Sequence, residues 1–126
     1  MINSEVAIMC EEGAYKLFKQ VFTKEELYIT PDKIYKEADN YILYWDWIKW
    51  DDYMPGVRAI ISVMKRLDEN EADGYSYKFL RLGESDNDVE SISNNDTDMD
   101  LYITRKIYIP DGFEEIDAKK SSTGGY

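Results

Sequence analysis

Residues 41–50 read YILYWDWIKW, and this stretch decides the fold. Its ten residues hold three Trp, two Tyr and three aliphatic side chains, with one acid and one base among them. Aromatic and β-branched side chains suit a pleated, half-buried surface, so the stretch predicts a long strand rather than a helix. Apolar residues occur at both the odd and the even positions of this stretch. Such a strand belongs in the middle of a sheet, with helices over one face and a loop, a second subunit or a partner over the other.

Strict alternation along this strand predicts which side chains share a face. One face is expected to carry the residues at odd positions, Tyr41, Leu43, Trp45 and Trp47. The other is expected to carry the even positions, Ile42, Tyr44, Ile48 and Trp50, interrupted by Asp46. Burial of an unpaired carboxylate is costly, so Asp46 is expected to face water or to meet a backbone donor or a base, for instance Arg81 or Arg105.

The flanking sequence predicts further elements in a definite order. Residues 6–10 suit a buried strand, and apolar residues at helical spacing follow from Ala14 to Val21. Residues 34–35 predict a short strand that forms a hairpin with residues 41–50. Pro55 begins a segment with an apolar stripe up to Leu67, which predicts a second helix. Two more strands are predicted at 75–82 and 101–109.

This order predicts an α+β fold with a mainly antiparallel sheet of about four to six strands and two helices packed on one face. The expected topology is the ferredoxin-like split arrangement. Residues 1–118 are expected to form a single domain. Residues 119–126, KKSSTGGY, have the composition of a flexible C-terminal tail.

The composition excludes several kinds of catalytic site. The chain has 126 residues, no His and a single cysteine, Cys10. Without His there is no Ser-His-Asp arrangement and no imidazole metal ligand, and one thiol cannot form a disulfide within the chain. Cys10 follows an apolar run and is expected to be a buried structural thiol. No cofactor and no metal are expected.

The net charge limits the classes of molecule that the protein can bind. Fifteen basic and 26 acidic side chains give a net charge of −11. Such a surface repels nucleic acid and anionic membranes and favours a basic protein partner. No apolar run is long enough to span a membrane, and the N-terminus lacks the basic region of a secretion signal, so a cytoplasmic protein is expected.

An acidic segment follows the strand predicted at 75–82. Between Gly83 and Leu101 every charged side chain is negative, and most acids are two residues apart. In an extended chain this spacing places them on one side, about 6 to 7 Å apart, which is comparable to the phosphate spacing of one nucleic-acid strand. The partner-binding residues expected from this pattern are the seven acids Glu84, Asp86, Asp88, Glu90, Asp96, Asp98 and Asp100. Asp51 and Asp52 are further candidates. The alternative is a solvated loop that keeps the protein in solution.

Tyrosine supplies a second type of contact residue. The chain has eleven Tyr and three Trp, and these residue types anchor protein interfaces. Tyr102 and Tyr108 lie on the polar face of the strand predicted at 101–109, so we expect them to contact a partner. The alternative is that they cover the second face of the sheet, within the monomer or in a homodimer.

A calcium site and carboxylate catalysis are two other uses of acidic side chains. Residues 96–100 begin like an EF-hand loop, but Leu101 replaces the required Gly and Ile107 replaces the bidentate Glu, so no calcium site is expected. Two carboxylates suffice for glycoside hydrolysis, and Asp46 is the acid with the most apolar neighbours. A small carboxylate-dependent enzyme with Asp46 in a pocket therefore stays as an alternative.

Residues 6–12, 41–50 and 77–84 together resemble the small acidic proteins carried by bacteria, their phages and mobile elements. Proteins of this type include phage-encoded inhibitors of host defence, among them anti-CRISPR proteins, several of which imitate nucleic acid. The resemblance implies a stoichiometric inhibitor. It has no shared motif, so it assigns no functional residue.

The sequence thus predicts a non-enzymatic inhibitor of the anti-CRISPR type that blocks a basic nucleic-acid channel of a Cas effector by acidic mimicry. An immunity protein that neutralises a nuclease toxin would have a similar surface and is an alternative. A homodimer that uses the aromatic face is a further one.

Overall fold

The computed structural model describes residues 3–69, 75–85, 88–94, 102–103 and 107–116. Its elements, in chain order, are β1 (Asn3–Glu11), α1 (Glu12–Phe22), the 3₁₀ helix η1 (Glu25–Leu27), β2 (Lys33–Glu37), β3 (Asn40–Lys49), α2 (Pro55–Glu69), β4 (Tyr77–Leu82), β5 (Val89–Ser93), β6 (Tyr102–Ile103), β7 (Ile107–Tyr108) and β8 (Glu114–Ile116). The stretch that decides the fold is strand β3, and both predicted helices are present.

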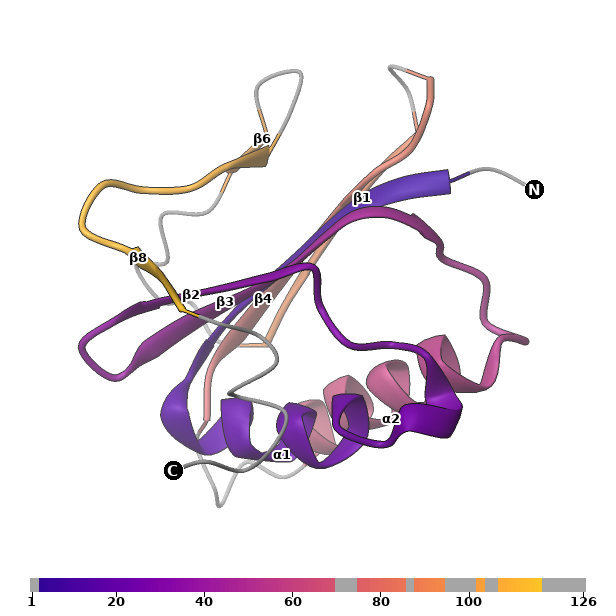
Figure 1. The fold of residues 1–126 in the computed structure, drawn as a ribbon, viewed down its shortest axis with the longest axis horizontal. Coiled ribbons are helices and arrows are strands. Elements are labelled where there is room, and N and C mark those ends of the chain that lie inside the picture. Colours follow the sequence, from indigo (N-terminus) through magenta and orange to yellow (C-terminus); the bar gives the residue numbers. More distant parts are fainter. Residues whose placement is uncertain (1–2, 70–74, 86–87, 95–101, 104–106, 117–126) are drawn as a thin grey trace.

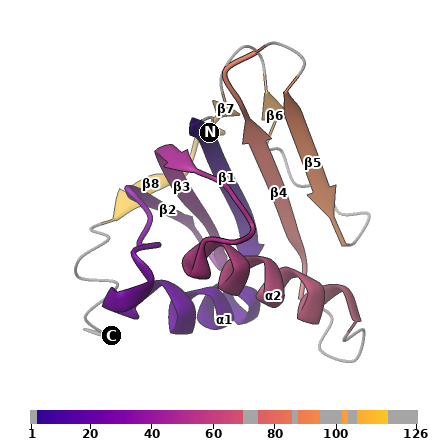
Figure 2. The ribbon, with the colours of Figure 1, turned by 90° about the vertical axis from the view of Figure 1, so that its right-hand side faces the viewer.

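Six strands form one antiparallel sheet in the order β5-β4-β1-β3-β2-β8. The inner four strands and the two helices follow one another as βαββαβ, with β3 inserted between β1 and β2. This is the split arrangement expected from the sequence. Strand β8 extends the sheet beside β2 at one edge (Figure 1), and β5 extends it at the other edge (Figure 2). The α+β fold is therefore confirmed.

Both helices cover the same face of the sheet (Figure 2). The alternation of β1 shows the consequence: Val6, Ile8 and Cys10 join the core beneath the helices, whereas Ala7 and Met9 point to the other face. Phe18 of α1 and Ile60 of α2 are fully buried in that helix-side core. Because apolar side chains on both faces of the sheet are removed from water, the sheet lies at the centre of the molecule.

The second face is covered by the chain itself. Ile107 of β7 is buried there against Ala7, Met9, Ile42 and Leu80. Two half-buried apolar side chains, Ile109 and Phe113, pack around this smaller core. Of the coverings expected for this face, a loop, a second subunit or a partner, the structure uses residues 107–113, which lie between the sheet strands β5 and β8 in sequence.

A β-bulge in β3 corrects the predicted faces of that strand. Ser4 pairs with Ile48 and Val6 pairs with Trp45, so β3 has one extra residue between these two pairs. The extra residue reverses the alternation beyond it. Ile48 and Trp50 therefore pack on the helix side with Trp45, and Trp47 is 65% exposed. The predicted faces are right up to Asp46, whose carboxylate lies beside the Tyr44 hydroxyl, and wrong for Trp47, Ile48 and Trp50.

The single strand predicted at 101–109 is also wrong. Residues 102–103 and 107–108 form two short strands, β6 and β7, which pair with each other. Tyr102 pairs with Tyr108, and Ile103 pairs with Ile107. The alternation of apolar residues in this stretch suits a strand in either arrangement, so it could not reveal that the chain reverses direction.

Cys10 is buried in the helix-side core, as the sequence predicts. Burial raises the pKa of its thiol far above the ordinary value, and the neighbouring Glu11 adds to the effect. The described helices α1 and α2 are both too short and too polar to cross a lipid bilayer.

Candidate functional site

A concave surface lined by charged residues lies where α2, the segment after β3 and the β4–β5 hairpin meet. A hollow of about 610 Å³ is lined there by one aromatic, one aliphatic and five charged residues: Trp50, Ile61, Asp51, Asp52, Arg81, Asp88 and Glu90. We call it the acidic hollow. It contains four carboxylates and one guanidinium, so its formal charge is −3.

The segment after β3 places the first two carboxylates. The chain turns at Asp51, whose N–H donates to the carbonyl of Lys49 at 3.1 Å and whose carbonyl accepts from the N–H of Met54 at 2.9 Å. Pro55 then begins α2, since its fixed φ suits the first helical turn. Asp51 and Asp52 are thereby held at the rim of the hollow, between a strand end and a helix start.

Trp50 forms a wall of the acidic hollow. Its ring lies 5.4 Å from the ring of Phe79 and 5.9 Å from that of Trp45, measured between centroids. These contacts join it to the helix-side core, because the bulge in β3 turns Trp50 inward. The indole is therefore a rigid apolar surface next to the carboxylates.

Arg81 of β4 organises the other two acids. Its Nη2 lies 2.7 Å from Oδ1 of Asp88, and its Nε lies 3.1 Å from Oε1 of Glu90. Nη1 donates a third hydrogen bond, of 3.1 Å, to Oγ of the buried Ser4. The guanidinium holds the pKa of Asp88 below its ordinary value. A planar guanidinium with three partners is fixed in orientation, so both acids are held in position.

Gly83 permits Asp88 to approach β4. The N–H of Gly83 donates to the carbonyl of Asp88 at 2.7 Å, and a Cβ at Gly83 would lie 1.9 Å from Oδ2 of Asp88. A larger residue would push the carboxylate away from its present place. The glycine that ends β4 in the sequence thus shapes the site as well.

The structure brings together some of the acids predicted as partner-binding residues. Asp88 and Glu90 line the acidic hollow with Asp51 and Asp52. Glu84 is exposed outside it and accepts a hydrogen bond of 3.3 Å from the N–H of Asn3. Four predicted acids lie outside the described residues: Asp86, Asp96, Asp98 and Asp100.

The two predicted tyrosines are described only in their backbone. Tyr102 and Tyr108 face each other across the β6–β7 pair. Other aromatic residues are exposed where sequence reasoning did not expect contact residues. Tyr28 is 89%, Trp47 65% and Tyr53 62% exposed. Of these, only Tyr53 carried a usable signal, because it follows two acids directly and precedes a helix-starting proline.

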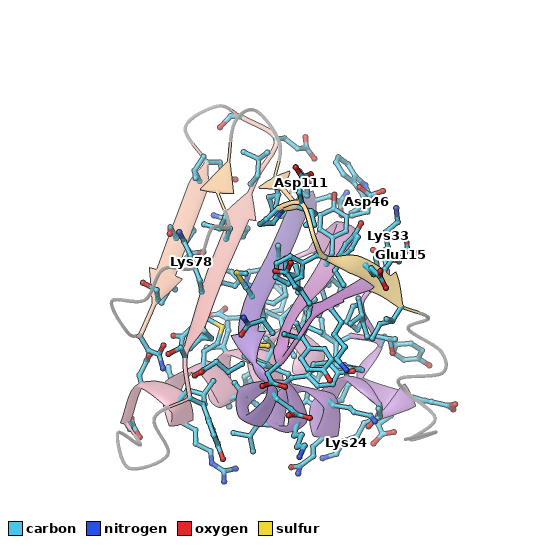
Figure 3. The ribbon with its side chains drawn as sticks, turned by 90° about the vertical axis from the view of Figure 1, so that its left-hand side faces the viewer. Lys24, Lys33, Asp46, Lys78, Asp111 and Glu115 are labelled. Atoms are coloured by element: carbon cyan, nitrogen blue, oxygen red, sulfur yellow. The ribbon has the colours of Figure 1, made fainter. Side chains whose placement is uncertain are left out.

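Asp46 lies elsewhere, on an exposed part of β3. The Tyr44 hydroxyl is held between two carboxylates: it donates to Glu5, and it lies 3.3 Å from Oδ1 of Asp46. Partial burial and the hydrogen bond to Glu5 raise the pKa of Tyr44. The N–H of Asp46 donates to Oδ2 of Asp32 at 2.7 Å. Figure 3 shows Asp46 on the same side of the sheet as Lys33 of β2.

The predicted pairing of Asp46 with Arg81 is wrong, because Arg81 is engaged by Asp88 and Glu90. Arg105 lies outside the described residues. The acidic hollow has other lining residues and does not include Asp46. Within the described part of the chain, no three His, Cys, Asp or Glu side chains are arranged to hold a metal ion.

The fold and the hollow define an α+β protein with a split βαββαβ sheet and an acidic concave surface beside its β5 edge. No family model matches the chain, and no curated protein and no solved structure is significantly similar to it. The acidic hollow is therefore the feature from which a function is inferred.

Proposed function

We propose that this protein is a non-enzymatic binding protein that presents the acidic hollow to a basic surface of another protein. The observation that carries the proposal is the convergence of carboxylates from two distant segments, Asp51 and Asp52 after β3 and Asp88 and Glu90 after β4. Their charge exceeds that of Arg81, and the whole chain has a net charge of −11. Complementary charge increases the rate of encounter and favours a partner of opposite sign.

The position of Arg81 supports binding rather than self-neutralisation. It occupies one side of Asp88 and Glu90, while an ionised carboxylate has about four lone-pair directions. Because the guanidinium already fixes the two carboxylates, they lose little side-chain entropy when a partner binds. Oxygen atoms that Arg81 does not contact remain able to accept hydrogen bonds from Lys or Arg of the partner.

Apolar side chains beside the acids supply the surface for affinity. Trp50 lines the acidic hollow, and Tyr53 and Met54 follow Asp51 and Asp52 directly with exposures of 62% and 41%. Aromatic residues with acids around them suit an interface in which the apolar part gives affinity and the charges give specificity.

The particular partner we propose is a Cas effector, with the acidic surface occupying its basic nucleic-acid channel in the cytoplasm of the host cell. The protein would then act as an anti-CRISPR inhibitor. The acids of residues 84–100 and the acidic hollow would take the place of phosphates, and the lysines and arginines of the channel would be the groups that bind them.

A competition experiment tests this function. Purified Cas ribonucleoproteins bind a labelled target DNA, and the protein is titrated in while fluorescence polarisation reports the bound DNA. We expect release of DNA from at least one effector, with slower association as salt rises. Absence of competition with every effector that binds the DNA would reject the anti-CRISPR mechanism.

Two variants with equal charge changes test whether inhibition depends on the acidic hollow or only on the net charge of the protein. The hollow variant is Asp51→Asn, Asp52→Asn, Glu90→Gln. The control variant, at exposed positions elsewhere, is Asp39→Asn, Asp111→Asn, Glu26→Gln. The hollow variant should lose at least about tenfold in potency and the control variant less than about threefold. Circular dichroism and thermal unfolding check that both are folded. Equal losses would show that only net charge matters.

A further inference from the structure

Strand β5 is the outermost strand of the sheet and has an unpaired side. It pairs with β4 in antiparallel register, from Val89 opposite Leu82 to Ser93 opposite Lys78. No strand among the described residues pairs with its other side, and Figure 2 shows it at the margin of the sheet. An edge of this kind presents free N–H and C=O groups that can pair with another chain.

The hydrogen bonds at the two ends of the β4–β5 pair identify the free groups. The N–H of Gly83 donates to the carbonyl of Asp88, and the N–H of Asn94 donates to the carbonyl of Tyr77. Backbone direction alternates along an antiparallel strand. The residues at even positions of β5 therefore bond to β4, whereas the odd positions, Val89, Ser91 and Ser93, direct their N–H and C=O groups outward.

Strand β5 contains neither Lys nor Pro, two residues that protect the edges of natural sheets. Residues 89–93 read VESIS, and their one charged residue, Glu90, is paired with Arg81 of β4. Val89 is 47% exposed, and four of the five residues of β5 are exposed to solvent. The strand therefore leaves its outer side accessible along its length.

The acidic hollow lies along the same strand, on the side of the sheet that the helices cover. Glu90 is opposite Arg81 and Ile92 is opposite Phe79, so both point to that side. A strand added to β5 would lie about 4.8 Å away, and every second side chain of it would project to the same side. A long basic side chain there would reach Glu90 with its charge, while its methylene stem packs on the apolar lining.

We propose that the outer edge of β5 binds an extended segment of the partner protein by strand addition, with Lys or Arg at alternate positions facing the acidic hollow. This inference rests on the proposed function and specifies the form of the basic partner. Main-chain hydrogen bonds to Val89, Ser91 and Ser93 supply affinity, and the alternate basic residues supply specificity.

Charge indicates whether the open edge of β5 pairs with a different protein or with a second copy of this chain. Pairing of β5 with β5 would bring together two strands that each carry Glu90 and adjoin a hollow of formal charge −3. Like charges placed close together oppose association. A basic segment meets the opposite condition, so the occupant is a different chain.

The probe is a short synthetic peptide of alternating Lys and Val, with a peptide of the same composition in two blocks as its control. Affinity is measured by calorimetry or by polarisation of a labelled peptide. The alternating peptide should bind at least about tenfold more tightly than the block peptide, and the hollow variant should lose this preference. Equal affinity for the two peptides would overturn strand addition.

Backbone N-methylation of the peptide gives the sharpest test. One set of methyl groups is placed on the odd-numbered peptide nitrogens and another on the even-numbered ones. Strand addition predicts that one set abolishes binding and the other leaves it within about threefold, since alternate N–H groups face β5. If both sets or neither set abolished binding, the peptide would not be adding as a strand.

A substitution in β5 tests the same edge from the protein side. Ser91→Pro removes an outward N–H and no bond to β4, and it should reduce binding at least about tenfold. Ser91→Ala keeps the N–H and should bind as the wild type does. The two proposals fail differently. Binding that depends on the hollow acids but not on N-methylation overturns strand addition alone, whereas peptide binding that the hollow variant retains in full overturns the acidic hollow as the binding surface.

Discussion

Arg81 and Asp88 form an ion pair of 2.7 Å between Nη2 and Oδ1 that joins β4 to the residue before β5. The same guanidinium bonds to Glu90 and to the buried Ser4. One side chain therefore links the N-terminal strand, the edge hairpin and the acidic hollow. The stability of the fold and the shape of the binding surface therefore both depend on the guanidinium of Arg81.

Replacement of Arg81 should destabilise the protein because it leaves three partners without their donor. Arg81→Gln is expected to lower the free energy of unfolding by about 1–3 kcal/mol, measured by urea unfolding. Arg66→Gln is the control, since it makes the same charge change at an exposed position of α2. It should cost about 0.5 kcal/mol or less. Similar losses in the two variants would show that the network contributes nothing specific.

The ion pair also predicts a pH dependence. Arg81 lowers the pKa of Asp88 below its ordinary value of 3.8, so the folded protein binds fewer protons than the unfolded chain as the pH falls through this region. The contribution of Asp88 to stability is therefore full above pH 3.8 and is lost as the pH falls through the folded pKa. The stability difference between the wild type and Asp88→Asn should shrink from pH 6 to pH 2.5. A difference that stays constant would contradict the ion pair.

Replacement of Gly56 tests how closely α2 approaches the end of η1 and the residues that follow it. A Cβ at this position would lie 2.4 Å from the carbonyl oxygen of Leu27 and 2.9 Å from Cβ of Ile29. Alanine usually stabilises a helix relative to glycine, but here Gly56→Ala should destabilise by about 1–3 kcal/mol. Ser62→Ala, on the exposed side of α2, should change stability by about 0.5 kcal/mol or less. A stabilising Gly56→Ala would mean that the two segments lie further apart.

Cys10 should be inert in the folded protein. Its side chain is fully buried, and burial raises the pKa of the thiol, so both access and thiolate are lacking. Reaction with a disulfide reagent at pH 8 should be at least about a hundredfold slower in buffer than in guanidinium chloride. Comparable rates in the two solvents would place the thiol at the surface.

Local patterns in the sequence predicted both helices and strands β1 to β4, but not the edge strands β5 and β8. The 41–50 stretch became β3, and the apolar spacing after Pro55 became α2, since both patterns reflect burial on a regular backbone. The split topology also followed from the order of the elements. The acidic character of residues 84–90 and the candidacy of Asp51 and Asp52 were visible in the composition alone.

The sequence alone could not predict the pairings between distant segments. The bulge that exposes Trp47 depends on the register between β3 and β1, and no local pattern records a register. The choice of Asp88 and Glu90 rather than Asp46 as partners of Arg81 depends on which strands become neighbours. Aromatic residues such as Tyr28 have the same local preference whether they are buried or exposed.

By itself the sequence determined the α+β class, the two helices, the buried thiol and the excess of negative charge, because each follows from residue type and spacing along the chain. Only the tertiary structure decided that Asp51 and Asp52 share a hollow with Asp88 and Glu90, and that this hollow adjoins the open edge of β5. The physical reason is that burial patterns act locally, whereas a site is made by side chains that folding brings together from distant positions.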